Sequence, residues 1–572
     1  MKTYTYDCLV IGTGAAGYNA AIRLTEFGVN CAIVTEGINC GTSRNTGSDK
    51  QTYYKLGLSG DSPDSVRKMA QNLFDGGSVD GDNALCEAAL SPRCFLHLCE
   101  LGVPFPTNRY GEYIGYKTDH DPFERATSAG PLTSKFMTEA LEKKADSLNI
   151  KIFDGCTVVK ILRHNDAVCG ILCIKDGETV AFRCRDVIMA TGGPAGIYAD
   201  SVYPECHTGS SGLAIDAGAK MQNLALWQYG LASICPRWNV SGTYMQVLPR
   251  FVSIDEDGIE HDFLWDYFED KPHGLSMVFL KGYQWPFDPK KAENGSSLID
   301  MLVYRECVEK KRRVYLDFTK NPCDINYKTL SNEAFDYLDK AGATFGTPIE
   351  RLAKMNAPAI DLYKDKGVDL YTEYLEIALC AQHNNGGIAV DAWWQTSIRG
   401  LFAVGECAGT HGIARPGGSA LNAGQVGSLR AAQYISKHPN ALVDEAIFSK
   451  IAADNSHFEI SECADEQIGK AARRMSDNAA AVRDLDKIKA TLEITLEEIK
   501  TANDPRVLDV LLTQGAVLTA MLNANSDPTK VQEVVLTGEG FQVSCRQARP
   551  IPKEDDFFEN VWRGYRENKN IY

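Results

Sequence analysis

A single arginine, Arg415, stands in a glycine-rich stretch that begins with a histidine. From His411 to Asn422 the chain reads HGIARPGGSALN, directly after the apolar run LFAVGECAGT. A guanidinium stays protonated near neutral pH, and its N–H groups suit carboxylate or carbonyl oxygens. The Pro-Gly-Gly triplet predicts a turn that aims Arg415 and brings the backbone close to a bound molecule. We read the stretch as a candidate anion-binding loop, with a surface loop as the alternative.

A second glycine-rich stretch follows the apolar segment TYDCLVI. It reads Gly12-Thr13-Gly14-Ala15-Ala16-Gly17 and opens a segment of small residues typical of a helix. Gly12 permits a tight turn, Gly14 lets the backbone approach a pyrophosphate, and Gly17 lets the helix pack closely on the sheet. The helix N-terminus supplies free N–H donors for phosphates. Glu36 ends the next strand, where a carboxylate accepts from a ribose hydroxyl. Together these features predict a dinucleotide site.

Two later segments indicate which dinucleotide binds. Ala190-Thr191-Gly192-Gly193 follows the apolar run VIMA, and Gly405 and Glu406 end the run LFAV. This trio resembles the flavoproteins with two dinucleotide-binding domains, in which such segments complete one FAD site. The resemblance places Glu406 near the ribityl or pyrophosphate part of FAD. Since the chain has no second GxGxxG, we expect FAD and no separate NAD(P)H domain.

The order of the segments narrows the resemblance. The chain is similar to the fumarate reductase / succinate dehydrogenase flavoprotein family, which also holds L-aspartate oxidase and soluble ene-reductases. The loop of that family reads H-G-[AT]-N-R-x-G-G-[NS]-[SA]-L, and Arg415, Gly417, Gly418 and Leu421 match it. The resemblance implies that Arg415 binds a substrate carboxylate and that His411 assists it. It also implies further FAD contacts, from Thr42, Ser43, Gly47, Ala420 and Leu421.

A second family arginine is the proton donor of an inserted domain. The segment LIDMLVYRECVE followed by VYLDFT resembles the one that carries it, and Arg305 aligns with that residue. An arginine is an unusual acid because it stays protonated near pH 7, yet it can relay a proton to a forming carbanion. The alternative is a structural arginine paired with Glu306 or Glu309.

Several positions depart from the family pattern. Gly230 stands where the family has a histidine in W-Q-F-H-P-T, and Gln382 stands at another histidine, with His383 one place late. We expect His383 to substitute there. The acid of the family's T-G-D-G is missing from the segment TGSSG at 208–212. The segment Gly41–Asn45 has no histidine for flavin attachment, so FAD is expected to be non-covalent. The space at Gly230 suggests a substrate that is bulkier than fumarate or carries one carboxylate.

The elements that must position these residues follow an α/β pattern. We predict a Rossmann-like FAD-binding domain with an inserted α+β capping domain and a C-terminal helical domain. The boundaries are 1–234 and 371–440 for the two parts of the FAD-binding domain, 235–370 for the cap and 441–572 for the helical domain. In the last, an apolar stripe at helical spacing predicts one long helix with a core-facing side; its members are Val482, Leu485, Ile488, Leu492, Leu496 and Ile499.

Composition and charge limit the kinds of partner that the chain can bind. The 572 residues carry a net charge of −16, from 59 basic and 75 acidic side chains. An acidic chain without a basic stripe argues against a nucleic-acid partner. No leader and no run of 18 apolar residues is evident, so we expect a cytoplasmic protein without direct membrane insertion. The cysteines have no C-x-x-C spacing, which excludes an iron–sulfur or zinc-ribbon signature and leaves no expected metal site.

These observations support a specific hypothesis. An FAD-dependent enzyme would reduce an activated C=C bond of an anionic or carbonyl-bearing small molecule, with Arg415, His411 and His383 holding it and Arg305 giving a proton. One alternative is an amino-acid or hydroxy-acid oxidase resembling L-aspartate oxidase. Another is a flavoprotein subunit that exchanges electrons with an iron–sulfur or other electron-donor protein. A third is a flavoprotein that has lost catalysis.

Overall fold

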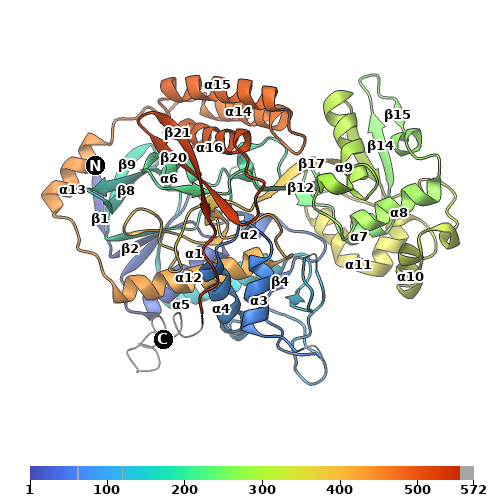
Figure 1. The fold of residues 1–572 in the computed structure, drawn as a ribbon, viewed down its shortest axis with the longest axis horizontal. Coiled ribbons are helices and arrows are strands. Elements are labelled where there is room, and N and C mark those ends of the chain that lie inside the picture. Colours follow the sequence, from blue (N-terminus) through green and yellow to red (C-terminus); the bar gives the residue numbers. More distant parts are fainter. Residues whose placement is uncertain (61–62, 119, 206, 554–572) are drawn as a thin grey trace.

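A five-stranded parallel sheet forms the centre of the computed structural model, which describes residues 1–60, 63–118, 120–205 and 207–553 (Figure 1). The order is β19-β10-β2-β3-β6, and every neighbouring pair is parallel. The strands are β19 (Leu401–Ala403), β10 (Asp186–Met189), β2 (Cys8–Ile11), β3 (Cys31–Val34) and β6 (Lys151–Phe153). They are short, and all but β6 are fully buried, which is why their sequences are apolar throughout rather than alternating.

Helices cover this sheet. Helix α1 (Ala15–Glu26) packs against α12 (Ser419–Lys437) and α5 (Thr133–Ser147), and α12 also contacts α4 (Gly81–Glu100). Close approach depends on small residues, because a Cβ at Gly17 would overlap the carbonyl oxygen of Gly12. The Ser428 hydroxyl donates to the carbonyl oxygen of Ala16 at 2.7 Å and ties α12 to α1. Between α1 and α5 the chain also forms α2 (Thr42–Asn45), α3 (Val66–Phe74) and the pair β4 (Tyr53–Tyr54) and β5 (Ala126–Thr127).

A second sheet lies beside the first, in the order β1-β9-β8-β7. Its strands are β1 (Lys2–Thr5), β7 (Thr157–His164), β8 (Ala167–Lys175) and β9 (Glu178–Arg183). Strand β1 pairs with β9 in parallel, while β7, β8 and β9 form an antiparallel meander. Helix α13 (Glu445–Asp454) covers it with Phe448 and Ala452.

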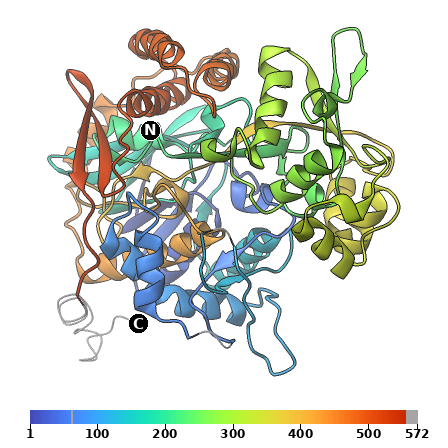
Figure 2. The same cartoon turned by 45° about the vertical axis from the view of Figure 1, so that its right-hand side comes forward.

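The cap forms a separate lobe (Figure 2). Its six-stranded sheet has the order β13-β12-β17-β16-β14-β15, and a core of its own draws on residues between Leu231 and Ile377. The long strands β12 (Trp227–Ser233) and β17 (Leu375–Asn384) connect this lobe to the body. The remaining elements are β13 (Trp238–Asn239), β14 (Arg250–Ile254), β15 (Glu260–His261), β16 (Arg313–Asp317), α7 (Thr243–Gln246), α8 (Lys271–Lys281), α9 (Ser297–Tyr304), α10 (Asn332–Lys340) and α11 (Pro348–Asp365).

The C-terminal part contains α14 (Ala464–Asn478), α15 (Leu485–Thr501) and α16 (Pro505–Leu522). It also contains a hairpin that the helical pattern did not predict, β20 (Lys530–Thr537) and β21 (Gly540–Gln547). The hairpin joins β11 (Met221–Gln222) and β18 (Gly387–Ile388) in one sheet. The predicted apolar stripe is wrong at its start. Helix α15 begins only after its N-cap, Asp484, and its first residue, Leu485, is 60% exposed, whereas Ile488 is buried.

Within the described ranges, one helix is long and apolar enough to cross a bilayer. It is α16, and 78% of the qualifying window is buried inside the fold. Its residues Val510, Ala516 and Leu518 belong to the main core. Burial of this kind is what a core helix shows.

Candidate active site

One cavity of about 760 Å³ runs from the carboxyl ends of β2, β3 and β10 toward the cap. Parallel sheets commonly bind ligands at this edge. Of the residues predicted from sequence, the cavity is lined by Gly12, Gly14, Ala15, Ala16, Glu36, Thr42, Ser43, Gly47, Ala190, Thr191, Gly192, His383, Gly405, Glu406, Arg415, Ala420 and Leu421. Gly17, His411 and Arg305 do not line it.

The glycine-rich turn after β2 forms one end of the cavity. Gly12 has φ +107°, and a Cβ there would lie 2.5 Å from the carbonyl oxygen of Ala190. Gly14 is the N-cap of α1, with φ −71°, and a Cβ on it would meet only the Ser43 hydroxyl, at 3.2 Å. Gly12 is therefore required by the fold, whereas Gly14 leaves the helix N-terminus open to an approaching phosphate. Gly17 acts in packing, as the spacing predicts, and stays behind the cavity wall.

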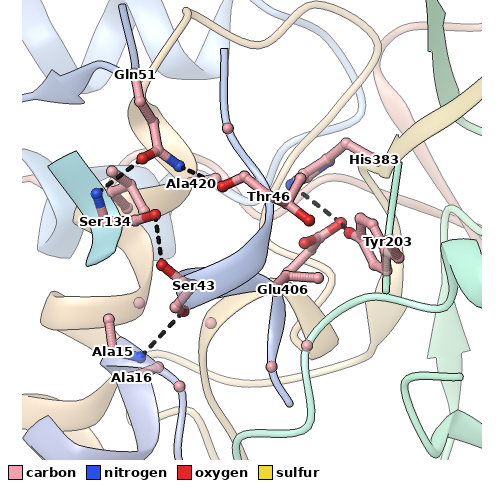
Figure 3. Close-up of a pocket in the computed structure, with 18 of the residues that line it drawn as sticks. Ala15, Ala16, Ser43, Thr46, Gln51, Ser134, Tyr203, His383, Glu406 and Ala420 are labelled. Carbon is pink, nitrogen blue, oxygen red and sulfur yellow. Dashed lines mark hydrogen bonds and ion pairs between the residues drawn. The ribbon is translucent and has the colours of Figure 1, made fainter. Parts of the chain in front are cut away.

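Residues 43–51, which follow β3, form one wall of the cavity and are connected to α1 and α5 by a chain of hydrogen bonds (Figure 3). The backbone N–H of Ala15 donates to Ser43 Oγ at 3.2 Å, and the Ser134 hydroxyl donates to the Ser43 carbonyl at 2.8 Å. The Ser134 N–H donates to Gln51 Oε1 at 2.8 Å, and Gln51 Nε2 donates to the Thr46 carbonyl at 3.3 Å. These bonds link α1, α5 and residues 43–51 around one wall.

The segment TGSSG, which lacks the acid of the family pattern, is contacted by a buried acid from a distant helix. Asp509 of α16 is buried and accepts from the Leu213 N–H at 3.1 Å, near the start of α6 (Ser211–Asp216). Burial raises the pKa of Asp509 to about 7, and Glu36 nearby adds to the rise. Glu36 lines the cavity here, as predicted. Sequence reasoning missed Asp509, since nothing local relates residues almost 300 positions apart.

Arg415 lies at the cap end of the cavity. Its Nη2 donates to Gln228 Oε1 of β12 at 2.7 Å, while Nε is buried without a hydrogen-bond partner among the described residues. Burial lowers the pKa of Arg415 from its ordinary value, and Glu406 opposes this shift. Burial likewise raises the pKa of Glu406 to about 7, although Tyr203 donates a short hydrogen bond to it.

His383 is neutral in this setting. Burial, helped by the charge of Arg415, lowers its pKa well below the ordinary value. Its Nδ1 lies 3.0 Å from Asn385 Oδ1, and the Asn385 amide is oriented because its Nδ2 donates to the Gly412 carbonyl at 2.6 Å. Nδ1 therefore carries the proton, and Nε2, 3.6 Å from Glu406 Oε1, presents a lone pair rather than a charge.

His411 lies behind this group. Its ring centroid is 5.6 Å from that of His383, and burial lowers its pKa well below the ordinary value. It lines a second, much smaller cavity together with Arg415. The predicted pair of His411 and His383 is thus brought together, but in this structure only His383 lines the main cavity.

The space at Gly230 is not open, which corrects the sequence-based expectation of room for a bulky substrate. The indole of Trp285, from the cap, fills it: a Cβ on Gly230 would lie 2.9 Å from Trp285 Nε1. Gln382 donates to the Gly230 carbonyl at 2.9 Å. Trp285 lines the cavity, and its buried Nε1 has no hydrogen-bond partner among the described residues. Tyr203 and Trp285 are lining residues that sequence reasoning missed, because neither belongs to a motif.

Arg305 is also placed differently from the expectation. It begins a π-helical turn after α9, and its guanidinium lies over the Tyr267 ring at 5.7 Å within the cap. The inner side of α9 carries Asp300, which pairs with Lys281 at 2.5 Å. Ile299, Leu302 and Val303 are buried on the side of α9 that packs in the cap core. Arg305 follows this helix and does not reach the cavity.

The cavity fits FAD. A glycine turn and a helix N-terminus stand ready for a pyrophosphate, and Glu36 stands at the ribose position of the motif. Thr191 Oγ1, His207 Nε2 and His383 Nε2 are buried atoms of lining residues without hydrogen-bond partners in the described chain. Buried polar atoms are nearly always paired, so such orphans indicate a polar ligand. The volume lies within the range of cofactor sites.

Comparison with known proteins agrees with this geometry. The FAD-binding domain family FAD_binding_2 matches residues 7–421. A subunit of the fumarate reductase (CoM/CoB) of Methanothermobacter marburgensis is 26% identical over 457 residues, covering 77% of this chain and 74% of that one. L-aspartate oxidase of Clostridium perfringens is 24% identical over 449 residues, covering 76% of this chain and 87% of its own length.

Solved structures share the fold over nearly the full length. Sdh1 of Mycobacterium smegmatis, in complex with UQ1, has a TM-score of 0.71 at 17% identity and covers 99% of this chain and 98% of its own. A quinol-fumarate reductase with menaquinol molecules has a TM-score of 0.70 at 18% identity, with 97% and 99% covered. The chain belongs to the FAD_binding_2 family, binds FAD, and has the fold of the fumarate reductase and succinate dehydrogenase flavoproteins.

Proposed function

We propose that this FAD-dependent oxidoreductase reduces the activated C=C bond of a small carboxylate- or carbonyl-bearing molecule. When bound, FAD supplies hydride chemistry, and the protein supplies orientation and charge. One observation carries the proposal: Arg415 is buried at the cap end of an FAD cavity, with Nη2 anchored on Gln228. The non-covalent attachment of FAD is part of the proposal, since residues 41–45 include no histidine.

The charge around Arg415 favours an anion. A buried guanidinium attracts an anion more strongly than one in water, because the local dielectric is low. The carboxyl that acts on it most strongly, Glu406, has a pKa of about 7 and so is only partly ionised at neutral pH. His383 is neutral, and Lys50 and Lys117 also line the cavity. Glu36 and Asp49 line it too, but burial raises the pKa of both carboxyls and so disfavours their charged forms. An incoming carboxylate or polarised carbonyl therefore meets an incompletely balanced positive site.

The reaction also needs a proton at carbon. Arg305 lies over Tyr267 and does not line the cavity, whereas Glu406 lines it. A carboxyl with a pKa of about 7 suits proton transfer near neutral pH. We propose Glu406 as the donor, which would place its carboxyl at the substrate instead of at the ribityl or pyrophosphate part of FAD that the resemblance implied. In Glu406→Gln we expect normal flavin reduction and at least a hundredfold slower product formation, with Arg305→Gln close to wild type. Loss of the same step in Arg305→Gln alone would return the role to Arg305.

The deciding experiment is anaerobic. The flavin is reduced, α,β-unsaturated acids and ketones are added, and reoxidation is followed at about 450 nm, the band of the oxidised cofactor. We expect Arg415→Ala to keep its FAD and to lose turnover at least a hundredfold, about 3 kcal/mol. The control is Arg399→Ala, an exposed arginine outside the cavity, paired with Asp166. Unchanged turnover in Arg415→Ala would refute the role of Arg415.

Two other functions have support in the comparisons. L-aspartate oxidase is a relative, so the same site could run as an oxidase; rapid reoxidation of the reduced flavin by air, with no response to enoates, would favour it. The relative from Methanothermobacter marburgensis is one subunit of a fumarate reductase. A flavoprotein subunit with an iron–sulfur or other electron-donor partner would copurify with that partner when isolated from its native source.

A further inference from the structure

A second cavity lies directly behind Arg415. It measures about 10 Å³, the room that a single water molecule needs. Arg415 lines both this rear cavity and the main one, so the residue lies between them. The other residues of the rear cavity are Leu73, Val79, Ala84, Glu87, Thr410, His411, Gly412, Ala414 and Pro416.

Three residues of the rear cavity bring polar atoms that need a partner. Glu87 Oε1, Thr410 Oγ1 and Arg415 Nε are all buried, and none has a well-formed hydrogen bond in the described part of the chain. Glu87 is 2% exposed and Thr410 is 5% exposed. A weak hydrogen bond from Thr410 and the charge of Arg415 both oppose the rise in the pKa of Glu87 that burial causes, so both groups lie near the Glu87 carboxyl. Since a buried polar atom left unpaired is destabilising, the cavity favours a bridging molecule.

The chemistry of the three atoms matches one water molecule. Arg415 Nε–H can only donate, the Thr410 hydroxyl can donate or accept, and a carboxyl oxygen of Glu87 can accept. A water molecule accepts from Nε and donates to the two oxygens. Three hydrogen bonds are the usual number for a buried water. A metal ion does not fit, since an arginine nitrogen offers no lone pair.

We propose that Glu87, Thr410 and Arg415 bind one buried water molecule, and that Glu87 acts through it as a positioning residue for Arg415. The guanidinium is then fixed at Nε by the water and at Nη2 by Gln228. Its remaining N–H donors are left for a ligand in the main cavity. The catalytic consequence rests on the proposed function, whereas the water site does not.

The first test is a crystal structure of the FAD-bound protein at about 1.5 Å resolution. We expect one ordered water within hydrogen-bond distance of Glu87 Oε1, Thr410 Oγ1 and Arg415 Nε. A cavity without water density, or direct bonds among the three side chains, would overturn the proposal. This result does not depend on any substrate.

The second test uses matched variants of the same protein. Thr410→Val removes the hydroxyl at nearly constant shape, and Thr410→Ser retains it. Glu87→Met removes the acceptor, and Glu87→Gln retains one. In Val and Met variants we expect loss of the water, a second rotamer for Arg415, and turnover about tenfold lower at unchanged FAD content. Ser and Gln variants should stay within about threefold of wild type.

The outcomes separate the two proposals. If the Val and Met variants lose the water but keep a single Arg415 rotamer, the positioning role is wrong. If Arg415 loses its order in these variants while wild-type protein reduces no enoate, the proposed function fails and the positioning role stands.

Discussion

Three glycines allow the FAD site to be separated from the fold that carries it. Gly12, Gly14 and Gly28 differ in what an alanine would meet. Gly28 has φ +78° and open space around it, so alanine there destabilises the fold only by backbone strain, about 1–2 kcal/mol. Gly12 has φ +107°, and a Cβ there would lie 2.5 Å from the Ala190 carbonyl oxygen. Alanine at Gly12 therefore combines a similar backbone strain with an overpacking cost of roughly 1–3 kcal/mol.

Gly14 should respond in the opposite way. Its φ of −71° suits alanine, and the added Cβ would meet only Ser43 Oγ at 3.2 Å. Because glycine is preferred to alanine at an N-cap and Ser43 Oγ must shift slightly, we expect the free energy of unfolding of the apoprotein to fall by only about 0.5–1 kcal/mol. The methyl group would stand where the pyrophosphate approaches and would remove about 1–3 kcal/mol of binding, which corresponds to roughly a 5- to 150-fold weaker Kd for FAD.

Two measurements decide the matter. Urea denaturation of the apoproteins gives the unfolding free energies, and titration with FAD, followed by quenching of its fluorescence, gives Kd. The expected order of destabilisation is Gly12→Ala, then Gly28→Ala, then Gly14→Ala. Only Gly28→Ala should bind FAD like wild type. Wild-type affinity in Gly14→Ala would refute the placement of the pyrophosphate at the start of α1. Equal destabilisation by Gly12→Ala and Gly28→Ala would refute the packing argument.

Three further results are expected. Trp285→Ala should open the space beside Gly230 and raise kcat/KM for bulky over small enoates about tenfold, while Trp285→Phe should not; an unchanged ratio would mean that the indole does not limit substrate size. The pKa of Glu87 is raised to about 8 by burial, so its protonated form favours the fold, and this stability is lost as pH rises from about 4.5 to 8. Glu87→Gln should therefore gain stability relative to wild type in urea denaturation across that window, by up to about 5 kcal/mol; parallel pH profiles would contradict the shift. Asp509→Ala should cost about 1–3 kcal/mol because it leaves the Leu213 N–H unpaired, whereas Asp509→Asn should cost less than about 1 kcal/mol; equal costs would show that the hydrogen bond is unimportant.

The glycine-rich motifs could be predicted from the sequence because the conformation of each depends on neighbouring residues in the chain. A strand, a glycine turn and a helix N-terminus form one continuous unit, so the spacing of Gly12, Gly14 and Gly17 was sufficient to predict their surroundings. The same holds for ATGG at 190–193 and for the glycine-rich loop around Arg415. The fold class was confirmed for the same reason, since alternating strand and helix units lead to a parallel sheet with helices on its faces.

Other features were decided only when distant segments met. Trp285 fills the space at Gly230, and Asp509 accepts a hydrogen bond from Leu213 beside the segment TGSSG; no local pattern encodes either contact. Arg305 shows the converse: its segment resembles that of a proton donor, yet the packing of α9 in the cap turns it away from the cavity.

By itself, the sequence determined that a parallel α/β fold binds FAD, and it predicted that Arg415 stands in an anion-binding loop. These properties follow from backbone conformation, hydrogen-bond donors and residue spacing within a few turns of chain. The tertiary structure alone decided which charges are buried together, which histidine reaches the main cavity and what fills the space at Gly230. The physical reason is that burial and side-chain packing depend on contacts between segments far apart along the chain, and these contacts set the pKa values and the shape of the site.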